Sequence, residues 1–253
     1  MLFFSKVVAA IFAVFTNSLA QPNVVFILTD DLGYYSPGFQ NLELITPALD
    51  KLVQSGLFLK EHYTYQFCAP ARGALMTGRF PFKLSATRTN FETDELDGID
   101  LRFDMLPVKL SKVGYASHHV GKWHMGFCDT RFTPLKRGFQ TTNGYFTAAE
   151  NHFNQEIAHN CTTNEGINVT ISDIWVNGAV GPSCKGVYND LRFSEAATNI
   201  ITRQQSKPFF LYLALSNTHS PLQVPAEFLD LYENISYAPQ KKFYAMVSFV
   251  DKV

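Results

Sequence analysis

A cysteine and an arginine stand four residues apart in QFCAPARGALMTG, the segment that covers residues 66–78. Cys68 lies at a proline-bearing corner between an aromatic-rich run and a helix-like run, and Arg72 follows it. A structural cysteine usually lies inside an apolar periodic segment, whereas a nearby cation and partial exposure are typical of reactive cysteines. The pattern therefore favours Cys68 as a residue that takes part in chemistry.

Three further polar groups have types and spacings that suit a reaction centre. Asp30 and Asp31 follow an apolar run, where such a pair most often caps a helix or a turn but can also give a hard cation two oxygen ligands. Lys122 and His124 share one face of an extended segment, which could equally face water. His219 precedes a Ser-Pro pair, as a turn residue also would. Each signal is weak alone, and only a shared location would make these residues a site.

The periodicity of apolar residues predicts the elements that must bring these groups together. Residues 23–28 and 208–215 are continuous apolar runs, the pattern of strands buried on both faces of a parallel sheet. Helix-like periodicity with caps and stop signals separates the extended segments. The other expected extended segments are 57–65 and 115–120, the expected helices are 46–56, 71–76, 106–113, 191–201 and 241–253, and residues 129–188 are expected to be a long irregular stretch.

Strands that alternate with helices predict an α/β fold with a mostly parallel central sheet flanked by helices. Ligands of such sheets bind beyond the carboxyl ends of the strands. Asp30, Cys68, Lys122 and His219 all follow or end expected strands. We therefore expect these side chains to lie together at one edge of the sheet.

Length and composition exclude several classes of protein. The chain has 253 residues, of which 46% are hydrophobic and 14% aromatic, enough for one large core. Its net charge is −1 and no run of Lys and Arg exceeds a pair, so we expect no nucleic-acid partner. Neither a C-x-x-C nor an H-E-x-x-H motif occurs, which disfavours a zinc site.

Residues 1–20 have the features of a signal peptide, with one lysine, a short apolar run and small residues before an expected cleavage after Ala20. The run is shorter than the roughly 20 residues of a membrane span, and no later segment is apolar enough to span. We therefore expect a mature chain of residues 21–253 in the secretory pathway, lysosomal or extracellular. Three N-glycosylation motifs agree with this route, at Asn160, Asn168 and Asn234.

The four cysteines are too few and too scattered for a small disulfide-built domain. Cys161 and Cys184 flank a polar stretch rich in Asn and Gly, and we expect them to form a disulfide in an oxidising compartment. Closing this loop would stabilise the folded chain by about 3 kcal/mol.

Four segments, in order, resemble the type I sulfatase family. Residues 68–78, CAPARGALMTG, resemble its first signature, and residues 121–126, GKWHMG, resemble its second. Residues 23–33, NVVFILTDDLG, are similar to its first strand with the metal-binding aspartates, and residues 211–225, LYLALSNTHSPLQVP, resemble the arylsulfatase B branch, which includes N-acetylgalactosamine-4-sulfatase. The resemblance implies an alkaline-phosphatase-like fold, with residues 21–253 as the N-terminal catalytic domain.

The resemblance also implies a reaction, the hydrolysis of sulfate esters on sulfated glycans or aryl sulfates. Cys68 would be converted by formylglycine-generating enzyme into formylglycine, whose hydrated aldehyde attacks sulfur with one hydroxyl. Its second hydroxyl then loses a proton and expels sulfate, which a serine could not do. Asp30 and Asp31 would ligate a calcium ion together with the oxygen of residue 68.

The remaining polar groups receive roles from the same resemblance. Arg72 would hold the formylglycine and the metal-site carboxylates in place. Lys122 and His219 would bind the sulfate group, and His124 would take the proton of the second hydroxyl. The leaving alcohol would be protonated either by His219 or by a further lysine of the family pattern.

Two other functions fit parts of the sequence. A phosphatase or phosphodiesterase of the related fold would generally use Ser or Thr with two zinc ions, which the Cys-x-Pro-x-Arg pattern disfavours. An inactive, secreted sulfatase-like glycoprotein is the other reading, because the family pattern continues with Asp-Asn metal ligands that have no counterpart up to Val253. We therefore expect a truncated chain with little sulfatase activity and an uncovered sheet edge that is prone to self-association.

Overall fold

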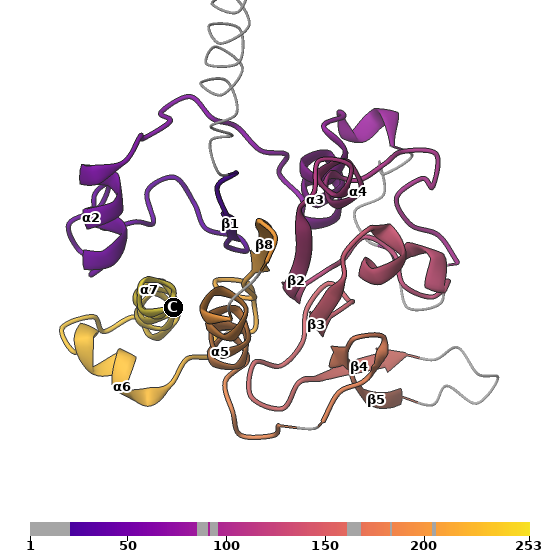
Figure 1. The fold of residues 1–253 in the computed structure, drawn as a ribbon. Coiled ribbons are helices and arrows are strands. Elements are labelled where there is room, and N and C mark those ends of the chain that lie inside the picture. Colours follow the sequence, from indigo (N-terminus) through magenta and orange to yellow (C-terminus); the bar gives the residue numbers. More distant parts are fainter. Residues whose placement is uncertain (1–20, 85–90, 92–95, 161–167, 183, 204–205) are drawn as a thin grey trace, which may run out of the picture.

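The computed structural model describes residues 21–253 apart from residues 85–90, 92–95, 161–167, 183 and 204–205. Its central sheet has the strand order β1-β8-β2-β3-β6-β7 in the described part of the chain (Figure 1). The first four of these strands are parallel to one another, and β6 and β7 continue the sheet with antiparallel pairing. The prediction of a mostly parallel sheet flanked by helices is therefore confirmed. The strands are β1 (Val24–Leu28), β2 (Ala116–Lys122), β3 (Thr141–Tyr145), β6 (Trp175–Val176), β7 (Ala179–Val180) and β8 (Phe209–Ala214), with a separate hairpin of β4 (Glu156–Asn160) and β5 (Asn168–Ser172).

Helices cover both faces of the sheet, and the alternation along β8 shows how (Figure 1). Phe210 and Tyr212 point into a core that includes residues of α3 and α4. Leu211 and Leu213 point to the opposite face and pack in a core with α5 and the end of α7. The helices are α2 (Pro47–Ser55), α3 (Cys68–Thr77), α4 (Leu106–Ser111), α5 (Asn189–Thr202), α6 (Ala226–Leu229) and α7 (Ala238–Lys252), with short 3₁₀ turns η1 (Pro81–Lys83), η2 (Thr130–Phe132), η3 (Pro134–Arg137) and η4 (Asp230–Tyr232).

Two predictions about extended segments were wrong. Residues 57–65 form no strand, because their backbone pairs with no other strand in the described chain. Residues 129–188 are not irregular, since they contain β3, which pairs with β2 from His118 to Lys122, as well as β4 to β7. Local sequence is a poor guide to both segments because pairing with a distant strand decides whether a strand forms.

Strand β1 was expected to be buried on both faces, and this prediction was also wrong. Val24, Val25 and Ile27 are exposed, with 37%, 42% and 53% of their surface accessible. β1 pairs only with β8 in the described chain and thus lies at an edge of the sheet. An exposed apolar edge strand is a template for pairing with another chain, so the expected self-association stays a prediction.

Several predictions concern parts of the chain that are described incompletely. The signal peptide, residues 1–20, lies outside the described residues, as does Cys161. Cys184 is a free cysteine whose sulfur lies 3.6 Å from the carbonyl oxygen of Pro182, so the disulfide to Cys161 is not seen and stays a prediction. Asn234 is exposed, and the backbones of Asn160 and Asn168 pair at one end of the β4–β5 hairpin. No helix in the described residues is long and apolar enough to cross a membrane.

Gly121 lets β2 approach β8 closely enough to position Lys122. Its φ is +99°, and a Cβ atom there would lie 1.9 Å from the carbonyl oxygen of Ala214. That carbonyl belongs to the backbone of β8, so it cannot move aside as a flexible side chain would.

We expect Gly121→Ala to lower the free energy of unfolding by more than about 3 kcal/mol, because overpacking adds to backbone strain. Gly186→Ala is the matched control, since Gly186 has φ +88° but no heavy atom within 4 Å of the added Cβ. Its cost should be about 1–2 kcal/mol. Urea-induced unfolding measures both, and equal losses would contradict the close-packing account.

Candidate active site

Asp30 is buried at the end of β1 between two cations. Its Oδ1 accepts a hydrogen bond from Arg72 Nη2 at 3.1 Å, and its Oδ2 accepts one from Lys122 Nζ at 2.6 Å. The side chains of Arg72 and Lys122 are 3% and 0% exposed. One carboxylate therefore joins the end of β1 to α3 and to the end of β2.

Electrostatics favour the ionised form of this carboxylate. Burial raises the pKa of Asp30, but the Arg72 guanidinium and the Lys122 ammonium outweigh it and hold the pKa well below its usual range. Arg72 also donates from Nη1 to the Lys122 carbonyl oxygen and to the Tyr212 hydroxyl, each at 3.2 Å. These bonds fix the guanidinium against both β2 and β8.

Cys68 begins α3 and faces the two carboxylates. Its Sγ lies 3.4 Å from Oδ1 of Asp30 and 4.0 Å from Oδ1 of Asp31. Burial is the largest influence on the thiol and raises its pKa; the charges of Lys122 and Arg72 oppose this increase, and those of Asp30 and Asp31 add to it. The unmodified side chain is thus a neutral thiol at neutral pH and a poor nucleophile.

His219 closes the other side of this group. Its Nε2 lies 3.7 Å from Oδ2 of Asp31, whose side chain is 57% exposed. Ligand atoms of Asp30, Cys68 and His219 all lie within 4.8 Å of one another, a spacing that could hold a metal ion. A hollow of about 410 Å³ is lined by Asp30, Asp31, Cys68 and Tyr65, among others.

His124 follows Lys122 on the same segment but is buried, with 1% of its surface exposed. Neither ring nitrogen has a hydrogen-bond partner among the described residues. Burial and then the charges of Lys122 and Arg72 hold its pKa well below its usual range, so the ring is neutral. A buried imidazole with two unused nitrogens is able to accept a proton from a bound group.

The residues that hold the segment before His219 in place were not predicted from the sequence. Asp190, in the first turn of α5, accepts hydrogen bonds from the backbone N–H groups of Ser216 and Asn217, both at 2.9 Å. His152 Nε2 lies 3.1 Å from the carbonyl oxygen of His219. Its position directly before the helix expected at 191–201 was the only local signal for Asp190, because its partners lie 26 and 27 residues away.

Comparisons with known proteins identify the family of this chain. A family model described as Sulfatase matches residues 22–253. The chain belongs to the sulfatase family. It is 31% identical over 239 residues to arylsulfatase J of Mus musculus, which is 94% of this chain and 39% of that protein. It is also 31% identical over 227 residues to N-acetylgalactosamine-6-sulfatase of Homo sapiens, which is 82% of this chain and 41% of that protein.

A solved sulfatase-fold neighbour is Ps i-CgsB in complex with k-i-k-neocarrahexaose. The TM-score is 0.81 at 30% sequence identity, and the match covers 92% of this chain and 53% of that chain. The chain thus spans about two fifths of the length of the curated relatives it matches. The family resemblance and the alkaline-phosphatase-like fold are confirmed.

Asp30 and Asp31 are neighbours in sequence with opposite environments, which gives a matched pair of variants. We expect Asp30→Asn to lower the free energy of unfolding by about 3–5 kcal/mol, because Lys122 and Arg72 would be left as buried charges. Asp31→Asn should cost less than about 1 kcal/mol, because that side chain is mostly in water. Chemical denaturation of both variants measures the difference, and similar costs would show that Asp30 does not organise the site.

His119 is buried, with Nε2 3.4 Å from the carbonyl oxygen of Lys122, and it makes the stability of the fold depend on pH in a known direction. Burial lowers its pKa to about 3, whereas an unfolded chain would titrate near 6.5. Below pH 6.5 the unfolded chain binds a proton that the folded chain does not, so stability falls as pH drops toward 3 and is fully present above pH 6.5.

We expect His119→Gln to lose roughly 2 kcal/mol less stability than the wild type between pH 7 and pH 5, because the variant lacks this titration. Unfolding by urea at several pH values measures it, with His62→Gln, at an exposed histidine, as the control. Parallel stability profiles for wild type and His119→Gln would exclude the assignment.

Proposed function

We propose that this chain carries the catalytic centre of an enzyme that hydrolyses sulfate esters, with sulfated glycans as substrates. The observation that carries the proposal is the buried Asp30 with its two cations beside Cys68, in a chain of the sulfatase family. Support for a glycan comes from relatives named N-acetylgalactosamine-6-sulfatase and from a neighbour solved with a carrahexaose. Residues 211–225 support the N-acetylgalactosamine-4-sulfatase branch as the finer assignment.

The donor atoms at the site fit a hard cation and an oxygen nucleophile. Oδ1 of Asp30 and Oδ1 of Asp31 both face the side chain of residue 68, and carboxylate oxygens are what calcium prefers. Asp30, Asp31 and an oxygen at position 68 would hold the ion. Bound there, calcium would supply positive charge beside the sulfate, and formylglycine would supply a nucleophilic oxygen and a second acidic hydroxyl.

The other side chains bind and move protons around that centre. Arg72 keeps Asp30 ionised and fixed. Lys122 presents a buried ammonium that can bind a sulfate oxygen, and His219, beside Asp31, can bind the same group. His124, neutral and with both ring nitrogens free of partners in the described chain, can take a proton from residue 68.

The raised pKa of Cys68 supports modification over direct use of the thiol. We propose that formylglycine-generating enzyme acts on the residues 68–72 pattern while the chain passes through the secretory pathway. The signal-like residues 1–20 and the motif at the exposed Asn234 support this route, toward the lysosome or the outside of the cell.

An inactive sulfate-binding glycoprotein is the second candidate. The observation in its favour is that Asp30 and Asp31 are the carboxylates that the described chain places at residue 68, whereas calcium usually takes 6–8 oxygen ligands. Turnover separates this candidate from the enzyme, since both would bind sulfate and both would carry the modification.

We expect secreted protein, made with formylglycine-generating enzyme, to contain the aldehyde at position 68 in the tryptic peptide. The enzyme proposal further predicts release of the alcohol of an aryl sulfate, whereas the inactive-glycoprotein candidate, with the little activity expected from the sequence, predicts none. Cys68→Ala should abolish turnover, and Cys68→Ser should allow no sustained turnover because it lacks the second hydroxyl. Mass spectrometry and a continuous assay measure these outcomes. Unmodified thiol alone would exclude the proposed chemistry, and aldehyde without turnover would identify the inactive glycoprotein.

A further inference from the structure

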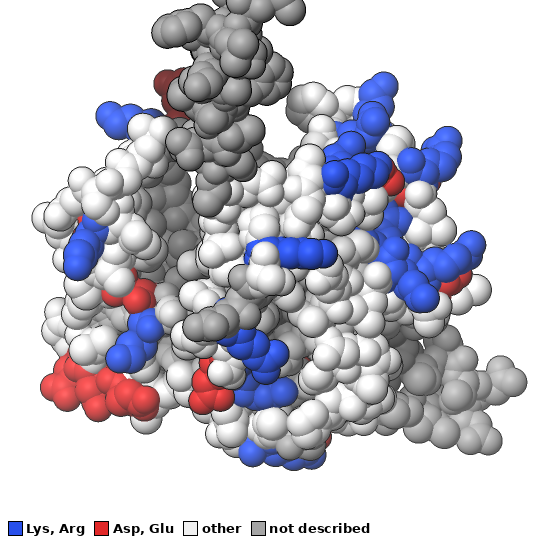
Figure 2. Space-filling view, viewed as in Figure 1, with Lys and Arg blue, Asp and Glu red and all other residues white. Residues whose placement is uncertain are grey.

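Lysine and arginine side chains gather on the face of the molecule over α3, η1 and α4, in the upper right of Figure 2, whereas acidic side chains gather over α6 at the lower left. A hollow of about 270 Å³ lies at this basic surface, just past the end of α3. Three cations line it with a single carboxylate, in the described residues. The lining residues are Thr77, Arg79, Arg102, Phe103, Asp104 and Lys109.

One aromatic ring holds the two arginines of this hollow. The guanidinium carbon of Arg79 lies 4.5 Å from the ring centroid of Phe103, and that of Arg102 lies 5.7 Å from the same centroid. Two guanidinium groups are thereby kept near each other despite their repulsion. Planar guanidinium groups fixed in this way are suited to the oxygens of a sulfate group.

The positive charge of the hollow is only partly balanced. Arg102 pairs with Asp100, and Asp104 pairs with Lys112 at 2.8 Å. Arg79 and Lys109 have no carboxylate partner in the described part of the chain. The C-termini of α3 and α4 favour cations at Arg79 and Lys109, and Asp100 pairs with Arg102. These local effects do not require the three side chains to line one hollow, as they do here.

The basic hollow is connected to the active site along α3. The catalytic hollow shares Tyr65, Ala71 and Leu75 with a second hollow of about 470 Å³, and this second hollow shares Arg79 with the basic one. The helix of ten residues between Cys68 and the basic hollow is about 15 Å long. Exposed rings of Tyr63 and Phe80, 83% and 73% accessible, line the middle of this path.

We propose that Arg79, Arg102 and Lys109 form a second anion subsite, which binds a sulfate group of a sulfated polysaccharide that runs along α3 from the active site. The proposal rests on the proposed function for the direction in which the polysaccharide runs, since the sulfate group to be hydrolysed would lie at Cys68. The ligand class is a polysaccharide with several sulfate groups, because one flexible polyanion can place sulfates in both hollows and sugar rings against the exposed aromatic side chains.

The test is direct binding of the full chain to a sulfated polysaccharide, chondroitin sulfate, measured at several salt concentrations. We expect Arg79→Ala/Lys109→Ala to weaken binding by about tenfold and to lessen its salt dependence, because two counterion-releasing contacts are lost. Lys109→Glu alone should weaken binding similarly and leaves the contact of Arg79 with Phe103 in place, so it covers the case in which the double variant does not fold.

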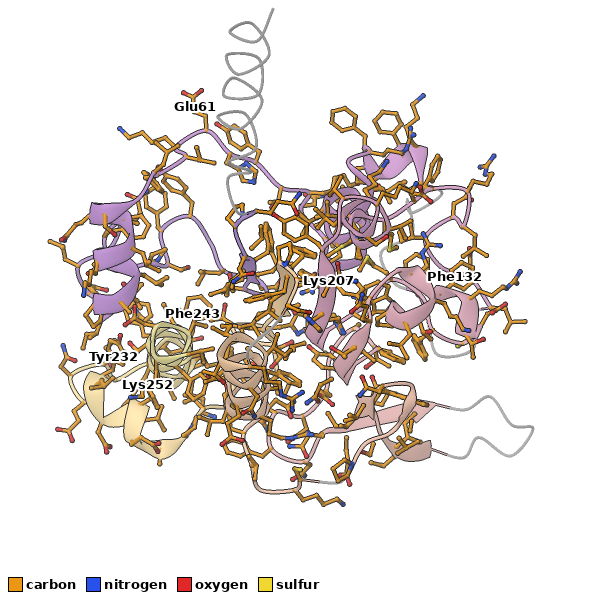
Figure 3. The ribbon with its side chains drawn as sticks, viewed as in Figure 1. Glu61, Phe132, Lys207, Tyr232, Phe243 and Lys252 are labelled. Carbon is orange, nitrogen blue, oxygen red and sulfur yellow. The ribbon has the colours of Figure 1, made fainter. Side chains whose placement is uncertain are left out.

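Arg203→Ala/Lys207→Ala is the matched control, with one arginine and one lysine removed from the exposed segment between α5 and β8, where Figure 3 labels Lys207. This pair should leave binding unchanged. The proposal is overturned if Lys109→Glu binds chondroitin sulfate as wild type does, if the control pair weakens binding equally, or if single-stranded DNA competes as well as the polysaccharide does.

Turnover of a small aryl sulfate by the same wild-type preparation tests the proposed function separately. If the wild type shows no turnover but Lys109→Glu still weakens the binding of chondroitin sulfate, the anion subsite is supported and the proposed function is rejected. If the wild type shows turnover but Lys109→Glu binds chondroitin sulfate as the wild type does, the proposed function is supported and the subsite is rejected.

Discussion

The buried carboxylate of Asp30 is the group on which the rest of the site depends. A buried ion costs several kcal/mol to desolvate, and this cost is offset only where geometry and hydrogen bonds are good. Asp30 meets that condition with Lys122 at 2.6 Å and Arg72 at 3.1 Å. Because the three residues come from the end of β1, the end of β2 and the first turns of α3, satisfying one carboxylate also brings Cys68 to the carboxyl ends of the strands.

Burial, more than these charges, determines the state of the thiol at position 68. Burial and the two carboxylates raise the pKa of Cys68, so a thiolate is not available there at neutral pH. An environment with carboxylates on one side and a buried ammonium on the other suits an oxygen nucleophile, a hard cation and a sulfate group better than it suits sulfur. The neutral His124 is the residue proposed to accept a proton from such an oxygen.

Much of the site could be predicted from the sequence because its residues follow short, strongly apolar segments. β8 was found from such a run, whereas β2 is polar and was expected only as the extended segment 115–120 after the helix expected at 106–113. Lys122 ends β2, and His219 follows β8 by five residues. β3 was missed because TTNGY is polar and contains glycine, and only its pairing with β2 makes it a strand. The prediction for residues 57–65 was wrong for the opposite reason. Their residue types favour a strand, but no partner strand is present in the described chain. Asp190 was missed because its role depends on hydrogen bonds to Ser216 and Asn217, which no local pattern records.

The most direct test of this account is a double-mutant cycle between Asp30 and Lys122, with unfolding free energies for Asp30→Asn, Lys122→Met and the double variant. If the buried ion pair organises the site, each single change leaves an unpaired charge and the double change removes both, so the double variant should be more stable than the sum of the single effects predicts by about 2 kcal/mol or more. Additivity within about 0.5 kcal/mol would mean that the two residues act independently, and would contradict the central role given to Asp30.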